Sequence, residues 1–205
     1  MESKEHLENL SYIRSMMESS TRFISLSGLS GVAAGAWALI GAGVVYFYSD
    51  GGYDGIPSSE YPMGISAMNF ELGVAMVVLA LALLSGYFFT ARKAKKGGAK
   101  FWSKASMRLS VNLAIPLVAG GLFCLILMHH GFWTMVGPCT LIFYGLGLVN
   151  GGKYTVDDIR KLGLIEIVLG LISAFWLKYT LLFWALGFGV LHIFYGALMY
   201  FKYEK

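Results

Sequence analysis

The apolar runs of this sequence constrain its fold more than any other feature. There are six of them, each on the order of 20 residues long, and polar or charged segments separate them. An α-helix rises about 1.5 Å per residue, so about 20 apolar residues span the hydrocarbon core of a bilayer. We therefore predict an all-α, polytopic membrane bundle of six transmembrane helices, over about residues 23–48, 71–91, 107–128, 132–149, 159–177 and 180–201.

Composition supports a membrane protein over a soluble one. Of the 205 residues, 57% are hydrophobic and only 14% are charged. A soluble domain of this length needs more charged surface. The net charge of +4 does not indicate a nucleic-acid partner, because the basic residues alternate with the apolar runs along the chain. We expect no nucleic acid and no cofactor.

The basic residues predict the orientation. Seven of the sixteen Lys and Arg residues lie in one loop: Arg92, Lys93, Lys95, Lys96, Lys100, Lys104 and Arg108. Basic loops stay on the cytoplasmic side. With six spans and both termini inside, fifteen of the sixteen basic residues are cytoplasmic and Lys178 alone is outside. We predict an inner (plasma) membrane protein whose basic loop attracts anionic lipid, at about 1 kcal/mol for each basic side chain near the surface.

The N-terminal segment differs from the rest of the chain, so we divide the sequence into residues 1–20 and a single transmembrane domain over 21–205. Apolar residues recur at helical spacing among charged ones in the first part: Leu7, Leu10, Ile13 and Met17. This pattern predicts an amphipathic helix along the cytoplasmic interface. Such a helix could also dock a cytoplasmic protein partner, and the bundle itself could form a homo-oligomer.

Small residues predict how the helices pack. Ser27, Gly31 and Gly35 recur every four residues on the first span, which allows close approach of another helix. Two short patterns also repeat. The sequence Ile-Phe-Tyr-Gly occurs at 142–145 and 193–196, and Gly-Leu followed by a second Gly occurs at 28–35 and 163–170. They fit three repeated hairpins, as in transporters with parallel repeats; chance agreement in apolar sequence is the alternative.

Glu166 and His192 are the ionisable residues placed most deeply in the predicted spans. Counting from the turn at Lys178 and Tyr179 places them at the same depth on antiparallel helices. An unpaired acid or imidazole is costly in hydrocarbon. We therefore predict that the two side chains lie within direct or single-water reach. They could form a proton- or ion-handling site, or a hydrogen-bonded pair that only joins two helices.

Three further polar positions form a predicted kink. Pro116 removes a backbone donor and so leaves the carbonyl of Asn112 without its helical partner. Asn150 lies level with Asn112 in the third-to-fourth hairpin, so an amide could satisfy this carbonyl. Later in the chain, Thr155 followed by Asp158 resembles a capping box at the start of the fifth span.

Sulfur and imidazole side chains gather near the turn between the third and fourth spans: Cys124, Met128, His129, His130, Met135 and Cys139. These ligand types suit copper or zinc. However, neither the spacing of paired cysteines nor that of paired histidines typical of metal sites is present. We predict no metal site.

Two resemblances accompany these residues. Gly28-Leu29-Ser30-Gly31 resembles the G-x-S-G helix of rhomboid intramembrane proteases, which implies Ser30 as nucleophile and His192 as base. No oxyanion-stabilising pattern accompanies the motif, so helix packing explains it better. The whole chain resembles an uncharacterised family of small six-span bacterial membrane proteins, on the residues 13–18, 25–31 and 202–205. That resemblance implies six spans and no assigned activity.

The sequence favours one of two functions. The first is a non-enzymatic membrane protein whose N-terminal helix and basic loop engage lipid or a protein partner. The alternative is a small transporter or channel with a proton- or ion-handling site at Glu166 and His192. The first is preferred from sequence alone, because a transport path usually shows several polar groups and these spans hold few.

Overall fold

The computed structural model describes residue 23 and residues 26–48, 67–96 and 102–205. The predicted helix over 1–20, the connection over 49–66 and Lys100 lie outside this part of the chain. Within it there are six long helical stretches and no strand. They are α2 (Gly28–Tyr48), α3 (Ala67–Lys96), α4 (Lys104–His129), α5 (Val136–Gly151), α6 (Asp157–Phe175), and a last stretch made of α7 (Thr180–Trp184), the π-helical η4 (Ala185–Leu191) and α8 (His192–Tyr203).

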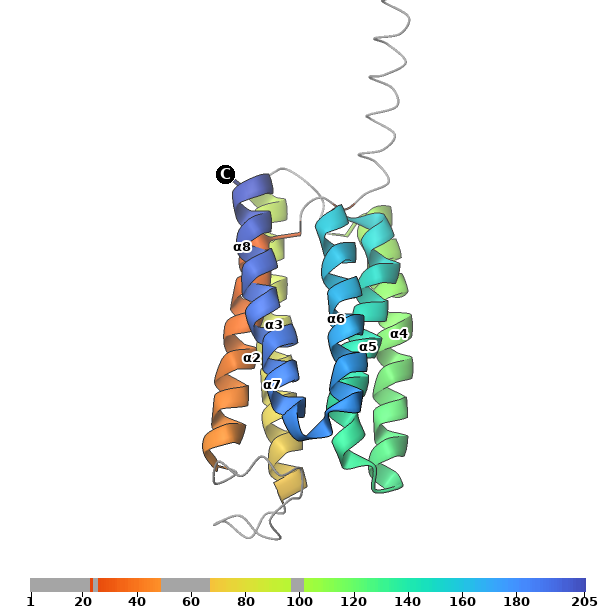
Figure 1. Cartoon of the computed structure of the whole chain (residues 1–205). Coiled ribbons are helices and arrows are strands. Elements are labelled where there is room, and N and C mark those ends of the chain that lie inside the picture. The colour runs from red at the N-terminus through yellow and green to blue at the C-terminus, as the bar shows by residue number, and fades with distance from the viewer. Residues whose placement is uncertain (1–22, 24–25, 49–66, 97–101) are drawn as a thin grey trace, which may run out of the picture.

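Five of these stretches are long and apolar enough to cross a membrane. By the length and hydropathy of its helices, the chain is a multi-pass membrane protein. The remaining helix, α6, carries five charged residues but lies alongside the others (Figure 1). Its charged residues are Asp157, Asp158, Arg160, Lys161 and Glu166.

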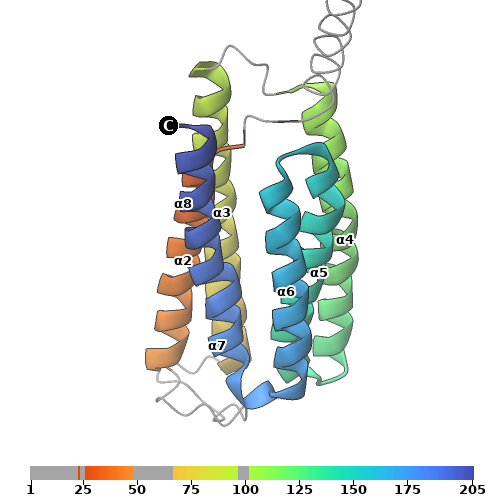
Figure 2. The same cartoon turned by 45° about the horizontal axis from the view of Figure 1, so that its top comes forward.

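The helices form two groups of three, which both views show side by side (Figures 1 and 2). In the α2 group, α2 packs between α3 and the stretch formed by η4 and α8. In the α5 group, α5 packs between α4 and α6. The last stretch passes from one group to the other, because α7 contacts α5 and α6 whereas η4 and α8 contact α2. Its π-helical segment therefore lies where the two groups meet.

The bundle has two distinct ends. The basic end holds Lys93, Lys104, Lys153 and Lys202, together with the C-terminus (Figure 1). The opposite end holds the turn after α4 and the turn after α6. Gly131 makes the former turn with φ +80°, a left-handed conformation that glycine adopts without steric cost. The short connection implied by the predicted spans 107–128 and 132–149 is present, although α5 begins at Val136 rather than at 132, because η1 (Trp133–Met135) intervenes.

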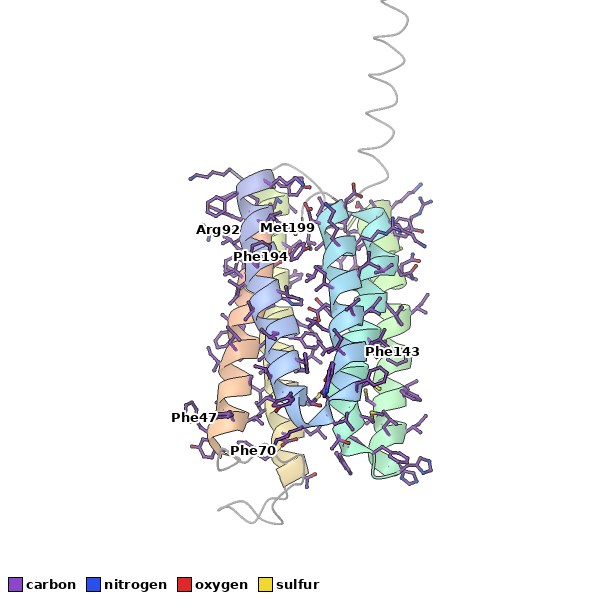
Figure 3. All side chains as sticks on the ribbon, viewed as in Figure 1. Phe47, Phe70, Arg92, Phe143, Phe194 and Met199 are labelled. Atoms are coloured by element: carbon purple, nitrogen blue, oxygen red, sulfur yellow. The ribbon has the colours of Figure 1, made fainter. Side chains whose placement is uncertain are left out.

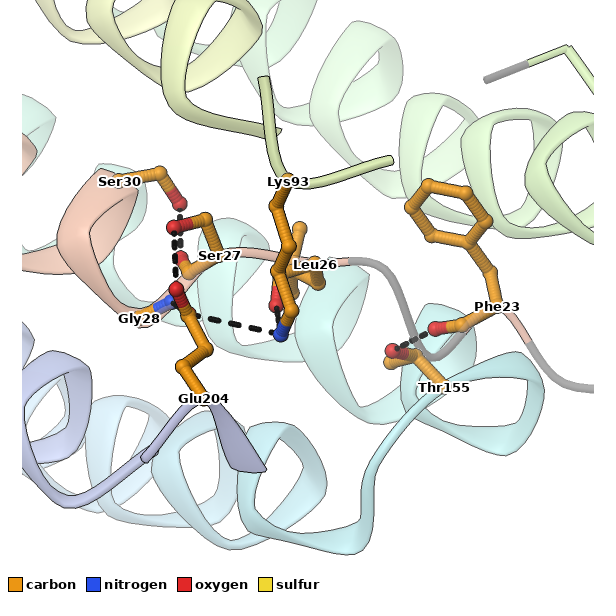
Figure 4. A network of polar contacts seen from close by, with 8 residues as sticks. All are labelled: Phe23, Leu26, Ser27, Gly28, Ser30, Lys93, Thr155 and Glu204. Atoms are coloured by element: carbon orange, nitrogen blue, oxygen red, sulfur yellow. Dashed lines mark hydrogen bonds and ion pairs between the residues drawn. The ribbon is translucent and has the colours of Figure 1, made fainter. Parts of the chain in front are cut away.

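The start of the first span and the start of α6 both differ from the prediction, for one shared reason. The Phe23 N–H donates to the Tyr154 carbonyl at 2.7 Å, and the Thr155 hydroxyl donates to the Phe23 carbonyl at 2.7 Å (Figure 4). These bonds hold Phe23 outside the helix, so α2 begins at Gly28 instead of 23. The Thr155 hydroxyl is directed toward Phe23 and caps no N–H of α6, so the predicted capping box is wrong and Val156 precedes α6 without a side-chain cap.

A capping box that sequence reasoning missed starts α4. The Ser106 N–H donates to the Ser103 hydroxyl at 3.1 Å, and the Ser103 N–H donates to the Ser106 hydroxyl at 2.8 Å. Serine replaces the usual Glu or Gln at the fourth position of the motif, which hides the pattern.

Glycines bring the central helices into close contact in two equivalent places. In the α5 group, a Cβ on Gly145 would lie 2.6 Å from the Gly163 carbonyl oxygen. In the α2 group, a Cβ on Gly196 would lie 2.7 Å from the Gly28 carbonyl oxygen. The predicted repeats are the segments that meet here: each Gly-Leu segment packs on an Ile-Phe-Tyr-Gly segment. The second glycine of each Gly-Leu segment also has an equivalent neighbour: Gly35 faces Ile193, and Gly170 faces Ile142.

Candidate functional site

Glu166 lies in the interior, where α6 faces the last helical stretch. The buried positions of α6 recur at three- and four-residue spacing, and they form one face: Leu162, Gly163, Glu166, Gly170 and Ser173. Glu166 and Ser173 are both 0% exposed. Among the described residues, neither carboxylate oxygen of Glu166 has a hydrogen-bond partner, and the Ser173 hydroxyl has none either.

His192, the first residue of α8, is the nearest ionisable neighbour of Glu166. Its Nδ1 lies 3.5 Å from Glu166 Oε1, so the predicted pair is present and the two side chains face each other. Nδ1 also lies 2.9 Å from the Gly187 carbonyl, and Nε2 lies 2.7 Å from the Tyr144 hydroxyl. A carbonyl only accepts, so Nδ1 carries a proton and donates it to Gly187. In the neutral ring, Nε2 then accepts from the Tyr144 hydroxyl.

The geometry of the site accommodates one exchangeable proton in either of two arrangements. In one, the carboxyl of Glu166 is protonated and the ring of His192 is neutral. In the other, Glu166 is ionised and the ring carries a second proton, on Nε2. Loss of that proton leaves a buried carboxylate with no counter-charge and no donor among the described residues. Such a charge costs several kcal/mol in a low-dielectric interior, so proton release requires that the site rearrange or admit water.

The π-helical segment shapes the wall of the site. Gly187 lies directly against the carboxylate, because a Cβ there would overlap Glu166 Oε2 and would come within 2.6 Å of Leu141 Cδ2. A π-helical turn is wider than an α-helical one and frequently occurs at functional sites. Here it presents the Gly187 carbonyl to His192, the fifth residue along.

Aromatic rings enclose the imidazole on its other sides. The ring of Phe188 stacks on His192 with centroids 5.9 Å apart, and the Tyr144 ring lies 5.3 Å from it. Trp184 in turn packs on Phe188, at 5.0 Å. These contacts fix the orientation of the imidazole and exclude water around it.

The contact predicted beside Pro116 is present, between α4 and α5 and apart from the Glu166 pair. The Asn150 side-chain amide donates to the Asn112 carbonyl at 2.8 Å, which is the carbonyl that Pro116 leaves without its helical donor. The Asn112 side chain donates to the Arg108 carbonyl in its own helix. The two asparagines thus have unequal roles, and this cluster does not contact Glu166.

The residues predicted to bind lipid divide into two sets. Five of them have exposed side chains around the end of α3 and the start of α4: Arg92, Lys95, Lys96, Lys104 and Arg108 (Figure 3 labels Arg92). Lys93 instead points inward. Its ammonium donates to the Leu26 carbonyl at 2.8 Å and lies 3.4 Å from Glu204 Oε1 (Figure 4).

Of the three predicted packing positions, Gly31 and Gly35 lie on α2 against the last helical stretch, whereas Ser27 precedes α2. A Cβ on Gly31 would lie 3.1 Å from the Gly196 Cα, and Gly35 contacts the η4–α8 backbone at Gly189 and Ile193. Ser27 is buried and its hydroxyl bonds to Glu204, whose carboxylate also accepts from the Gly28 N–H.

The other candidate chemistries receive no support from the geometry. The Ser30 hydroxyl donates to the Ser27 carbonyl, and both ring nitrogens of His192 have other partners, so the two are not hydrogen-bonded. Cys124 and Cys139 are free thiols. In the part of the chain that the structure describes, no three His, Cys, Asp or Glu residues are placed to hold a metal ion.

Comparison with known proteins returns nothing. No protein-family model, no curated protein and no solved structure matches this chain.

Proposed function

We propose that this protein is a small proton-coupled membrane transporter, in which Glu166 and His192 bind the proton. One observation carries the proposal: the Glu166 carboxylate is fully buried, has no hydrogen-bond donor among the described residues, and lies 3.5 Å from an imidazole. Because release of the proton needs a rearrangement, proton binding and conformation are coupled. Ionisable residues inside transmembrane bundles commonly form proton relays in pumps and transporters.

The same proposal includes six spans, with the basic end in the cytoplasm. The position of α6 among the five apolar stretches supports the sixth span, since its charged residues other than Glu166 lie in its first turns at the basic end. The positive-inside rule supports the orientation. Division of the bundle into two groups of three also fits a transporter that rocks one group against the other around a midplane site.

Anionic lipid binding is a second property that the structure favours, though for fewer residues than predicted. The five exposed basic side chains on α3 and α4 are available to lipid headgroups, whereas Lys93 holds the bundle together. Because the Glu166 site is buried, we rank transport above the lipid- or partner-engaging function that the sequence alone favours.

A proton titration tests the proposal. We compare proton uptake by purified wild-type protein, Glu166→Gln and Glu71→Gln over the pH range in which the bundle stays folded. Glu71, exposed on α3, is the matched control. We expect Glu166→Gln to lose about one proton per chain, in a titration step that Glu71→Gln retains. Wild-type and Glu166→Gln curves that coincide would contradict the proposal.

A further inference from the structure

The contacts that join the two groups at the basic end are polar and come from few residues. Asp158 of α6 is 4% exposed, and its Oδ2 accepts from the Lys202 ammonium and the Tyr203 hydroxyl of α8, each at 2.9 Å. Phe23 also bonds across this end, because its N–H donates to the Tyr154 carbonyl and its carbonyl accepts from the Thr155 hydroxyl. Polar contacts of this kind can exchange for water without loss of hydrogen bonds.

An apolar layer lies between these contacts and the proton site. One helical turn further into the membrane, α6 carries Leu162 and α8 carries Met199, which are 3% and 4% exposed. Met199 lies near the basic end in Figure 3. Glu166 follows one turn beyond Leu162. A polar layer and then a single apolar layer therefore separate Glu166 from the aqueous phase at this end.

The opposite end is joined by packing as well as by the chain. The chain crosses between the groups at both ends, from α3 to α4 at the basic end and through η3 (Leu177–Tyr179) at the opposite end. At the opposite end it leads directly into α7, which packs on both α5 and α6, and Gly137 of α5 lies against the Thr180 side chain. Because packing accompanies the chain link at this end, a rocking motion opens the basic end first.

We infer that Asp158, Lys202 and Tyr203, backed by Leu162 and Met199, form a gate through which protons reach Glu166 from the basic end. This inference rests on the proposed function, since it concerns access to the proton site. When the gate closes, Lys202 and Tyr203 donate to Asp158 and the apolar pair excludes water. When it opens, water hydrates all three polar groups and reaches the carboxylate of Glu166.

Acid alone does not open this gate at mildly acidic pH. Burial raises the pKa of Asp158, but the hydrogen bonds from Lys202 and Tyr203 and the charges of Lys202 and Lys161 outweigh it, so the pKa lies below its usual range. An aspartate whose pKa is lower in the folded than in the unfolded protein stabilises the fold fully at pH values above its unfolded-state pKa. This stabilisation is lost as the pH falls through the folded-state pKa. The ionisable groups that face Asp158 in the described chain are Lys202, Tyr203 and Lys161.

Thiol labelling tests the gate. The reporter is Leu162→Cys in a chain with Cys124→Ala and Cys139→Ala, labelled in membranes by a small water-soluble methanethiosulfonate added at the basic end. We expect Lys202→Met with Tyr203→Phe to raise the labelling rate roughly three- to tenfold, the range for loss of about one net hydrogen bond, because the pair made by the half-exposed Lys202 is weakened by solvent. Lys161→Met is the matched control: that lysine lies 3.8 Å from Asp158 but within α6, so its loss leaves the rate unchanged.

The outcomes separate the gate from the proton site. Equal labelling rates in the double variant and in Lys161→Met overturn the gate, whatever the proton titration of Glu166 gives. If the double variant does not fold, Tyr203→Phe alone gives the same comparison with a roughly twofold expected increase.

Discussion

At the residue scale, pairing decides the role of each intramembrane polar group. Asn150 uses its amide to satisfy a carbonyl of another helix, whereas Asn112 bonds within its own. Glu166 is the contrasting case, because its carboxylate has a neighbouring ring but no donor among the described residues. A satisfied polar group stabilises one arrangement; an unsatisfied one makes its protonation state depend on the conformation around it.

The asparagines give a direct test of this distinction. We expect Asn150→Leu to lower the free energy of unfolding by about 1–3 kcal/mol, because it leaves the Asn112 carbonyl beside Pro116 without a donor. Asn112→Leu removes only a bond within α4 and keeps that carbonyl paired, so its effect is smaller. Thermal unfolding in one detergent compares the two variants, and a larger loss for Asn112→Leu would refute the assignment.

At this scale, the sequence predicts a pair more easily than its surroundings. The shared depth of Glu166 and His192 follows from counting residues on antiparallel helices, and the structure places them in contact. Tyr144 and Gly187 were missed, although Tyr144 lies within a repeated segment. Their roles depend on how α5 rotates and on a π-helical turn, and neither is set by apolar periodicity.

At the scale of elements, close glycine contacts join consecutive helices, α5 and α6, and also helices far apart in the chain, α2 and α8. α2 packs on α8, and the predicted hairpin of the fifth and sixth spans is divided, since α6 packs chiefly on α5. Apolar periodicity and charge predict where helices lie along the chain. They do not predict which helices meet, because a lipid-facing surface and a helix-facing surface are both apolar.

Matched glycines test the importance of these contacts. Gly163→Ala would place a Cβ 2.7 Å from the Gly145 carbonyl oxygen, whereas Gly121→Ala on α4 would meet nothing within 4 Å among the described residues. We expect Gly163→Ala to destabilise the bundle by about 1–3 kcal/mol, as overpacking does. Gly121→Ala should be neutral or stabilising by up to about 1 kcal/mol, from helix propensity. Denaturation in detergent measures both, and indistinguishable variants would argue against close packing.

At the scale of the whole molecule, charge and shape together support the orientation. The basic side chains lie mostly at one end of the bundle, and Lys178 lies at the other. This arrangement follows from the sequence, because an even number of spans returns each basic loop to the same side. The division of the helices into two groups of three could not be predicted from the sequence.

Labelling of intact cells tests the orientation. A cysteine placed at Ser58 should react with an impermeant reagent added outside, while one at Gly98 should react only after the membrane is permeabilised. Both positions are polar loop residues of the sequence, so reactivity reports the side of the membrane and not burial in hydrocarbon. Equal reaction of the two positions in sealed cells would exclude the six-span topology.

The contact between α2 and α8 also has a consequence for biogenesis. The ribosome delivers α2 to the membrane as the first of the described helices and α8 as the last. Until residue 196 has left the ribosome, the α8 surface that packs on Gly28, Gly31 and Gly35 is missing. During this time the backbone at these glycines faces lipid or a transient neighbour. A nascent chain that stalls before α8 therefore displays an unfilled glycine groove, a feature by which membrane chaperones and quality-control proteases could distinguish it from the finished protein.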